Sequence, residues 1–265
     1  MLAADLATHI EYIWLVPLGF AVGAVGTLIG AGGGFILAPV LLLLFPNEQP
    51  LVISTISLAV VFLNATSGSV AYARLRRINY RSGLLFAAAS VPGAILGAML
   101  VKLVPREVFA RVLGTLLTAM AVYLLIHKHT EERAEKDAAG PADVPRYSRV
   151  LACAISFVVG GVSSLLGIGG GIIHVPFMVK VLKFRAHVAT ATSHFVLAIM
   201  AGAGTVVHIA SGDFHTGVHR TLFLGVGVLA GAQIGAALST RLHGKWIIRC
   251  LAVALVFVGV RTLIG

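Results

Sequence analysis

Acidic residues and cysteines are scarce in this sequence. Of its 265 residues, 10 are Asp or Glu and two are Cys, and only 11% are charged, whereas 58% are hydrophobic. A chain so poor in charge cannot cover a water-soluble domain with polar surface, and its mean hydropathy of +0.97 is typical of membrane proteins. Cys153 and Cys250 lie in apolar sequence without metal-ligand spacing, so we expect them to pack in the interior.

Basic residues outnumber acidic ones. The 20 Lys and Arg residues give the chain a formal net charge of +10. They fall in short clusters between apolar segments, as membrane topology requires, so the charge does not indicate a nucleic-acid partner. The N-terminus carries Asp5 and Glu11 before the first apolar run, whereas a cleaved signal peptide begins with positive charge. We expect the first segment to be retained in a multi-pass protein of the cytoplasmic membrane.

Apolar segments of membrane-spanning length fall into two groups of four, with a polar linker between them. Residues 127–149 are rich in charge, Pro and Gly and cannot be buried in lipid. The sequence predicts an all-α polytopic membrane protein with a first repeat (1–126), a cytoplasmic linker (127–149) and a second repeat (150–265). The predicted segments are 12–45, 51–73, 82–101 and 108–126, then 150–182, 187–210, 218–240 and 246–264.

Each group contains one dense glycine run, and the two runs are in register. The chain reads GTLIGAGGGFILAP at 26–39 and SSLLGIGGGIIHVP at 163–176. Such regular spacing indicates the duplication of one ancestral unit, a common construction of membrane transporters. Further matching pairs lie 136 to 138 positions apart, namely Pro39 and Pro176, Ser57 and Ser193, Gly93 and Gly231, and Arg111 and Arg249.

Loop charges orient the two repeats, because Lys and Arg in short loops favour the cytoplasmic side. The loop after the second segment is strongly basic in the first repeat, but its counterpart holds Arg220 with Asp213. The loop after the first segment holds Glu48, whereas its counterpart is basic, and the third pair of loops is basic in both repeats. Two of three comparisons predict inverted repeats with both termini outside the cell. The other residues compared are Arg74, Arg76, Arg77 and Arg81; Lys180, Lys183 and Arg185; and Lys102 and Arg106 with Arg241, Lys245 and Arg249.

Inverted repeats require an odd number of crossings in each half, which bears on the long glycine-containing segments. Residues 12–45 would extend about 50 Å as one helix at ~1.5 Å per residue, too far for one straight span. A break at the glycines resolves both problems. We therefore predict a glycine-broken or re-entrant first segment in each repeat, followed by three full crossings.

The glycine runs carry the main functional prediction. Backbone that is unwound at membrane depth survives only inside protein or against a wet cavity, and glycine lets a ligand approach the backbone. The helix that restarts after each run directs its free N–H groups into the break, which favours an anion. The alternative is that the glycines only permit close helix packing. The predicted binding residues are Gly30, Gly32, Gly33 and Gly34 with Gly167, Gly169, Gly170 and Gly171.

Hydroxyl groups form a second duplicated feature, because both repeats open an apolar span with Ser and Thr. Hydroxyls can donate to an anion without adding a fixed charge that would trap it. They can equally cap a helix or bond back to its carbonyls, and both interpretations stay open. The candidate hydroxyl residues are Ser54, Thr55 and Ser57 in the first repeat and Thr192 and Ser193 in the second. His194, which directly follows Ser193, is a candidate binding residue as well.

Three histidines, His174, His194 and His208, lie inside or at the edge of apolar segments, where ionisable residues are functional candidates. None has a histidine counterpart in the first repeat. His194 directly follows the second hydroxyl cluster, and His174 follows the second glycine run. These two histidines are therefore the candidates for proton coupling or pH gating. The alternative for each is a hydrogen-bonded structural histidine.

The paired glycine runs ending at Pro39 and Pro176, the motifs at Ser57 and Ser193, and the small-residue spacing beginning at Gly93 resemble the sulfite exporter TauE/SafE family of membrane permeases. The resemblance covers nearly the whole chain. It implies transport, usually outward, of sulfite, sulfoacetate or related small sulfur-containing or organic anions, with no cofactor and no enzymatic activity. One departure is the Ile56–Ser57 pair, where a Thr–Ser pair would be typical. The oligomeric state, including a homo-oligomer, stays open.

Parts of the sequence are compatible with three other functions. His208, Asp213 and His215 are similar to metal-binding clusters of nickel and cobalt permeases, but a metal site needs more ligands than this stretch offers. A serine protease would have to pair Ser67 with a histidine, and the duplication argues against it. An anion channel remains the main alternative, because inverted repeats also build channels.

Overall fold

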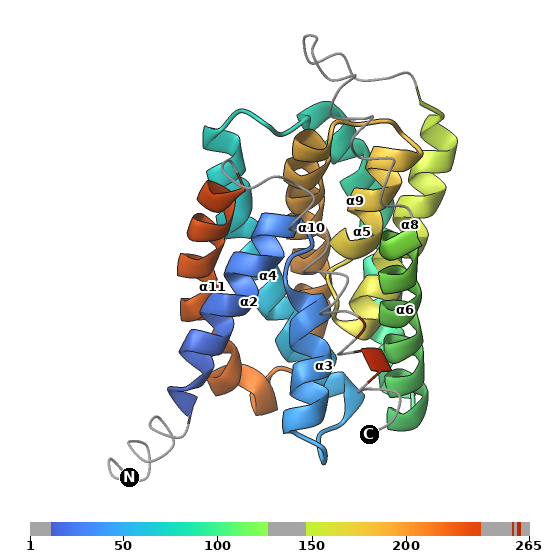
Figure 1. Cartoon of the computed structure of the whole chain (residues 1–265). Coiled ribbons are helices and arrows are strands. Elements are labelled where there is room, and N and C mark those ends of the chain that lie inside the picture. The colour runs from blue at the N-terminus through green and yellow to red at the C-terminus, as the bar shows by residue number, and fades with distance from the viewer. Residues whose placement is uncertain (1–11, 127–146, 240–255, 257–258, 261–265) are drawn as a thin grey trace.

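The computed structural model describes residues 12–126, 147–239, 256 and 259–260. In this part of the chain all regular structure is helical, and five helices are long and apolar enough to cross a membrane. Most of the predicted linker and most of the predicted last segment lie outside the described residues. The elements are α2 (Leu15–Ile29), α3 (Gly34–Leu44), α4 (Pro50–Arg74), α5 (Tyr80–Leu100), η1 (Val101–Leu103), α6 (Arg106–Ile126), α8 (Arg149–Leu166), α9 (Gly171–Lys180), α10 (Ala186–Ala210), η2 (His215–Gly217) and α11 (Val218–Leu238) (Figure 1).

The first apolar segment is broken at its glycine run and turns back. α2 ends at Ile29 and α3 begins at Gly34. The guanidinium carbon of Arg220, in the first turn of α11, lies 5.9 Å from the ring centre of Tyr12 and 4.0 Å from that of Phe45. The beginning and the end of this segment therefore lie at the same end of the bundle, called here the Arg220 end.

The second repeat contains the corresponding hairpin. α8 ends at Leu166 and α9 begins at Gly171. Before α8, the ring of Tyr147 lies 5.7 Å from that of Phe184, which follows α9, and its hydroxyl donates to Ser82 in the first turn of α5. This end of the bundle is called the Tyr147 end.

The two ends are opposite, as the long helices show. α5 starts at the Tyr147 end and continues into η1, where Lys102 pairs with Asp213 just before α11. α4 and α10 occupy matching positions in the two repeats and run antiparallel, because Leu58 lies against Gly204 while His194 lies against Gly68. The two glycine hairpins thus enter the bundle from opposite ends.

Small residues allow two pairs of helices to approach closely. α2 packs on α11, and α5 packs on α8. A Cβ at Gly93 would overlap the backbone oxygen of Phe157, and one at Gly231 would overlap that of Phe20. Phe20 and Phe157 hold matching positions in the sequence. The close contact between α11 and α2 therefore corresponds to the close contact between α5 and α8. Both glycines belong to the small-residue motifs found in the sequence, and both act as packing sites.

Candidate functional site

The two glycine runs adopt the same unwound backbone. Gly30, Gly32 and Gly33 have φ of 82°, 77° and 77°, and the corresponding glycines of the second run have φ of 68°, 79° and 60°. These left-handed values are strained for any residue with a Cβ, which explains why the sequence needs glycine there. Each run ends one helix with a left-handed glycine and begins the next helix with another.

The two breaks are buried and touch each other. A Cβ on Gly34 would lie 2.6 Å from the carbonyl oxygen of Gly167, and one on Gly171 would lie 2.6 Å from the Cα of Ala31. Val61 of α4 packs against both runs, within reach of a Cβ at Gly32, Gly34 or Gly169. The predicted binding glycines of the two repeats therefore form one shared centre.

Backbone amides are left free at the start of α3 and α9. Ile36 and Leu37 donate to the carbonyl of Gly33, which closes the first turn of α3. Among the described residues, the amides of Gly34 and Phe35 have no backbone acceptor, as expected for the first residues of a helix. At the start of α9 the same holds for Ile172. Buried amides of this kind are donors for an anion.

The predicted serines bind the carbonyls of the breaks. Ser57 of α4 donates to Gly167 over 2.5 Å, and Ser193 of α10 donates to Gly30 over 3.3 Å. These two contacts are equivalent in the repeats, and each links a long helix of one repeat to the break of the other. Ser54 similarly donates to the carbonyl of Ser164 over 2.9 Å. In this state the three hydroxyls act as caps that hold the breaks in place.

The other two hydroxyl candidates differ. Thr192 accepts a hydrogen bond from the backbone amide of Asn79 over 3.0 Å, so it fixes the start of α5 and lies away from the breaks. The Thr55 hydroxyl is buried and has no hydrogen-bond partner within the described residues. Of the predicted Ser and Thr donors, Thr55 alone is therefore unengaged in the part of the chain that the structure describes.

His194 belongs to a polar cluster beside the first break. Thr27 donates to the side-chain oxygen of Asn64 over 3.1 Å, so its hydroxyl oxygen accepts from Nε2 of His194 over 3.2 Å. Tyr72 donates to the Thr27 carbonyl over 2.7 Å and packs edge-on against the His194 ring. All four side chains are buried. His194 thus reaches the first break through Thr27 and not through the second run.

His174 is placed differently. Its Nε2 lies 3.1 Å from the Ser156 hydroxyl of α8, and its ring stacks on Phe86 of α5. The side chain therefore faces α8 and α5, while its own backbone amide donates to Gly170. These contacts are compatible with the alternative of a hydrogen-bonded structural histidine.

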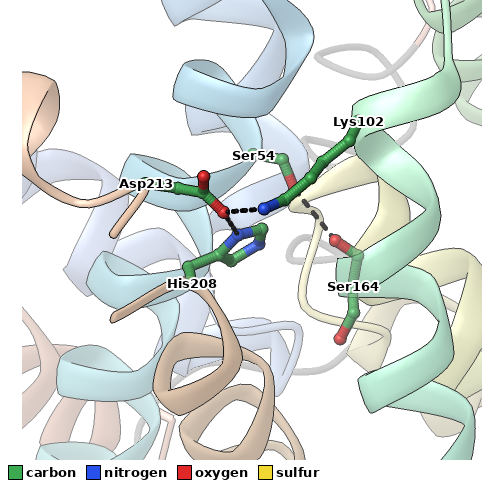
Figure 2. A network of polar contacts seen from close by, with 5 residues as sticks. All are labelled: Ser54, Lys102, Ser164, His208 and Asp213. Atoms are coloured by element: carbon green, nitrogen blue, oxygen red, sulfur yellow. Dashed lines mark hydrogen bonds and ion pairs between the residues drawn. The ribbon is translucent and has the colours of Figure 1, made fainter. Parts of the chain in front are cut away.

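A charged counterpart of the His194 cluster lies on the other side of the breaks. His208 occupies the position that matches Tyr72, and Ser164 the position that matches Thr27. Asp213 lies 3.7 Å from Nδ1 of His208 and 2.8 Å from Nζ of Lys102. Figure 2 shows Lys102 and Asp213 pointing toward each other with the His208 ring beside them. Lys102 is thus the ion-pair partner of Asp213, and no group of three metal-binding side chains gathers anywhere in the described residues.

Sequence reasoning missed Thr27, Tyr72, Ser164 and Lys102. A signal for two of them was present, because a hydroxyl residue precedes the first glycine of each run by three positions, Thr27 in one and Ser164 in the other. The roles of Tyr72 and Lys102 carry no such signal. Each depends on a partner that is 45 or more positions away.

Comparisons with known proteins cover nearly the whole chain. The family model described as "Sulfite exporter TauE/SafE" matches residues 15–262. The chain is 32% identical to "Probable membrane transporter protein YunE" of Bacillus subtilis (strain 168), over 94% of this chain and 96% of that protein. It is 23% identical to "Probable membrane transporter protein MJ0441" of Methanocaldococcus jannaschii, over 89% of this chain and 90% of that protein. No solved structure gives a significant match.

Proposed function

Because this chain belongs to the sulfite exporter TauE/SafE family of membrane transporters, we propose that it is a secondary transporter that exports small sulfur-containing or organic anions, such as sulfite or sulfoacetate. The observation that carries the proposal is the contact between two buried, unwound glycine runs, one from each repeat. Secondary transporters commonly hold substrate where such broken helices meet.

The chemistry of this centre favours an anion. The first amides of α3 and α9 point into the breaks, and a helix N-terminus carries partial positive charge. The three acidic residues of the described chain, Glu48, Glu107 and Asp213, all lie at the Arg220 end. An anion between the breaks would therefore meet donors without meeting a carboxylate from the described residues.

The hydroxyl candidates complete the proposed site. Ser57 and Ser193 hold the carbonyls of Gly167 and Gly30, and rotation of either hydroxyl would offer its proton to a bound anion. Thr55 is a buried donor without a partner among the described residues and is proposed to bind the anion with no such exchange. Gly30, Gly32, Gly33 and Gly34, their counterparts Gly167, Gly169, Gly170 and Gly171, and Ser54 and His194 shape and support the centre in this proposal, whereas Thr192 fixes the start of α5 and takes no part in it.

The repeats are proposed to be inverted, with access alternating between the two ends. Support comes from the antiparallel run of α4 and α10 and from hairpins that enter at opposite ends. The Tyr147 end is proposed to be cytoplasmic, because many basic residues gather there. These are Arg74, Arg76, Arg77, Arg81, Arg149, Lys180, Lys183 and Arg185.

Reconstitution in liposomes tests the proposal. Efflux of sulfite, sulfoacetate and thiosulfate would be measured with and without a pH gradient, at increasing anion concentration. We expect saturable flux of at least one anion, and flux that rises without saturation would instead indicate the channel alternative. If none of the three anions moves and none shifts the thermal stability of the purified protein, the proposed anion specificity is wrong.

A further inference from the structure

One carboxylate oxygen at the Arg220 end is shared by two cationic side chains. Oδ2 of Asp213 lies 2.8 Å from Nζ of Lys102 and 3.7 Å from Nδ1 of His208. The Lys102 side chain is 39% exposed and that of Asp213 is 12% exposed, whereas His208 is fully buried. The cluster thus connects the surface of this end to the interior (Figure 2).

Polar atoms beside this pair lack partners. Neither ring nitrogen of His208 has a hydrogen bond within the described chain, and neither does the hydroxyl of Ser164. Both side chains are fully buried, and Ser164 lies against Gly204, one turn before His208 on α10. Buried polar groups without partners are uncommon in folded proteins, and either an ordered water or a bound ion can supply the missing contact.

In the corresponding cluster of the other repeat, the two side chains at the matching positions both have partners, although Nδ2 of Asn64 and Nδ1 of His194 have none within the described residues. Tyr72, which matches His208, donates to the Thr27 carbonyl, and Thr27, which matches Ser164, bonds both Asn64 and His194. The same positions therefore form a hydrogen-bonded network without an ion pair toward the Tyr147 end and a cluster with an ion pair toward the Arg220 end. Within the described residues, the cluster at the Arg220 end combines a lysine with unpaired buried polar groups, and this combination favours an anion there.

We propose that Lys102, His208 and Ser164 form a second anion-binding site, the station of the transported anion at the Arg220 end, with Asp213 as its internal competitor. This inference rests on the proposed function. Without an anion, Asp213 holds the Lys102 ammonium. When His208 takes up a proton, its ring becomes a second cation for Asp213, and the Lys102 ammonium is released to bind the anion. Proton and anion then enter the site together, so the added charges offset each other.

The surroundings of His208 are consistent with this exchange. The charged groups that act on its ring are Asp213, from the loop after α10, and Lys102, from η1. The neighbouring positions of α4 and α8 carry the neutral side chains Ser54 and Ser164. Nearby, Arg220 and Glu48 pair with each other at 2.7 Å, and Asp213 is not part of that ion pair.

Isothermal titration of the purified full-length protein with sulfoacetate, at about pH 5 and about pH 8, tests the proposal, because the charge of histidine changes in this interval. We expect roughly tenfold tighter binding at the lower pH. Lys102→Gln should weaken binding roughly 10- to 100-fold at the lower pH, as expected for loss of a charged partner. His208→Gln should leave weak binding at both pH values.

Asp213→Asn gives the decisive result, because misfolding cannot produce a gain. We expect it to bind tightly at both pH values, since Lys102 is then free throughout. Arg111→Gln is the matched control: Arg111 is an exposed cation at the same end, paired with Glu107 at 3.8 Å, and its loss should change neither affinity nor pH dependence. Wild-type affinity in Lys102→Gln, or no gain in Asp213→Asn, overturns this inference alone. Absence of binding to the wild-type protein counts against the proposed function as well.

Discussion

The contact between the two breaks gives the sharpest prediction, which is made with Gly171→Ala. Gly171 has ordinary helical φ, so alanine adds no backbone strain, but its Cβ would lie 2.6 Å from the Cα of Ala31 and closer still to the Gly30 carbonyl oxygen. Both obstacles are backbone atoms, which cannot rotate away. The breaks must separate, and overpacking of this kind costs about 1–3 kcal/mol.

Both stability and transport report this separation. At about 2–4 °C per kcal/mol for a chain of this size class, the melting temperature should fall by about 2–12 °C. Anion flux in liposomes should fall much further, because the start of α9 is displaced from the proposed site. Gly161→Ala is the matched control, since a Cβ there lies 3.5 Å from the Gly93 oxygen, an ordinary contact. Wild-type flux and stability in Gly171→Ala would refute the close approach of the breaks.

Three further predictions test the backbone conformation, the caps and the topology. Gly33→Val should abolish flux while the protein still inserts, because Gly33 has φ of 77°. Gly212→Val is the control: Gly212 has φ of 73°, but a Cβ there has nothing within 4 Å, so this variant should retain flux. Equal flux in the two variants would contradict a special role for the break. Ser57→Ala should lower stability by about 1 kcal/mol, measured by thermal unfolding, through loss of its bond to Gly167; an unchanged melting temperature would show that the cap is dispensable. A cysteine in the 127–146 linker should resist membrane-impermeant labelling of whole cells, and rapid labelling would reverse the proposed orientation.

Much of the architecture was predictable because it is encoded locally. Hydropathy identifies apolar helices, and glycine at Gly30 and Gly167 is read directly as a place where a helix ends. The duplication is equally visible, since matched positions keep their spacing along the chain. The contacts of Gly93 and Gly231 follow the same rule, because small residues at helical spacing mark close packing.

The candidate site was less predictable, because side-chain partners depend on distant segments. Ser57 and Ser193 were recognised as hydroxyls near the breaks, but capping and substrate contact were equally open until their acceptors, 110 and 163 positions away, were known. His194 and His174 both lie in apolar segments of the predicted second repeat, and the sequence does not separate them. In the structure, His194 lies beside the first break, whereas His174 faces α8. Only packing separates their roles.

The sequence by itself determined that this protein is a helical membrane protein whose helices are interrupted at two glycine runs, because hydropathy and backbone freedom are properties of short stretches. Only the tertiary structure decided that the two breaks touch and that the hairpins enter from opposite ends. It also brought Lys102, Asp213 and His208 together. Those facts depend on which surfaces pack against each other, and three residues from η1, a loop and α10 become one cluster only when the helices are assembled.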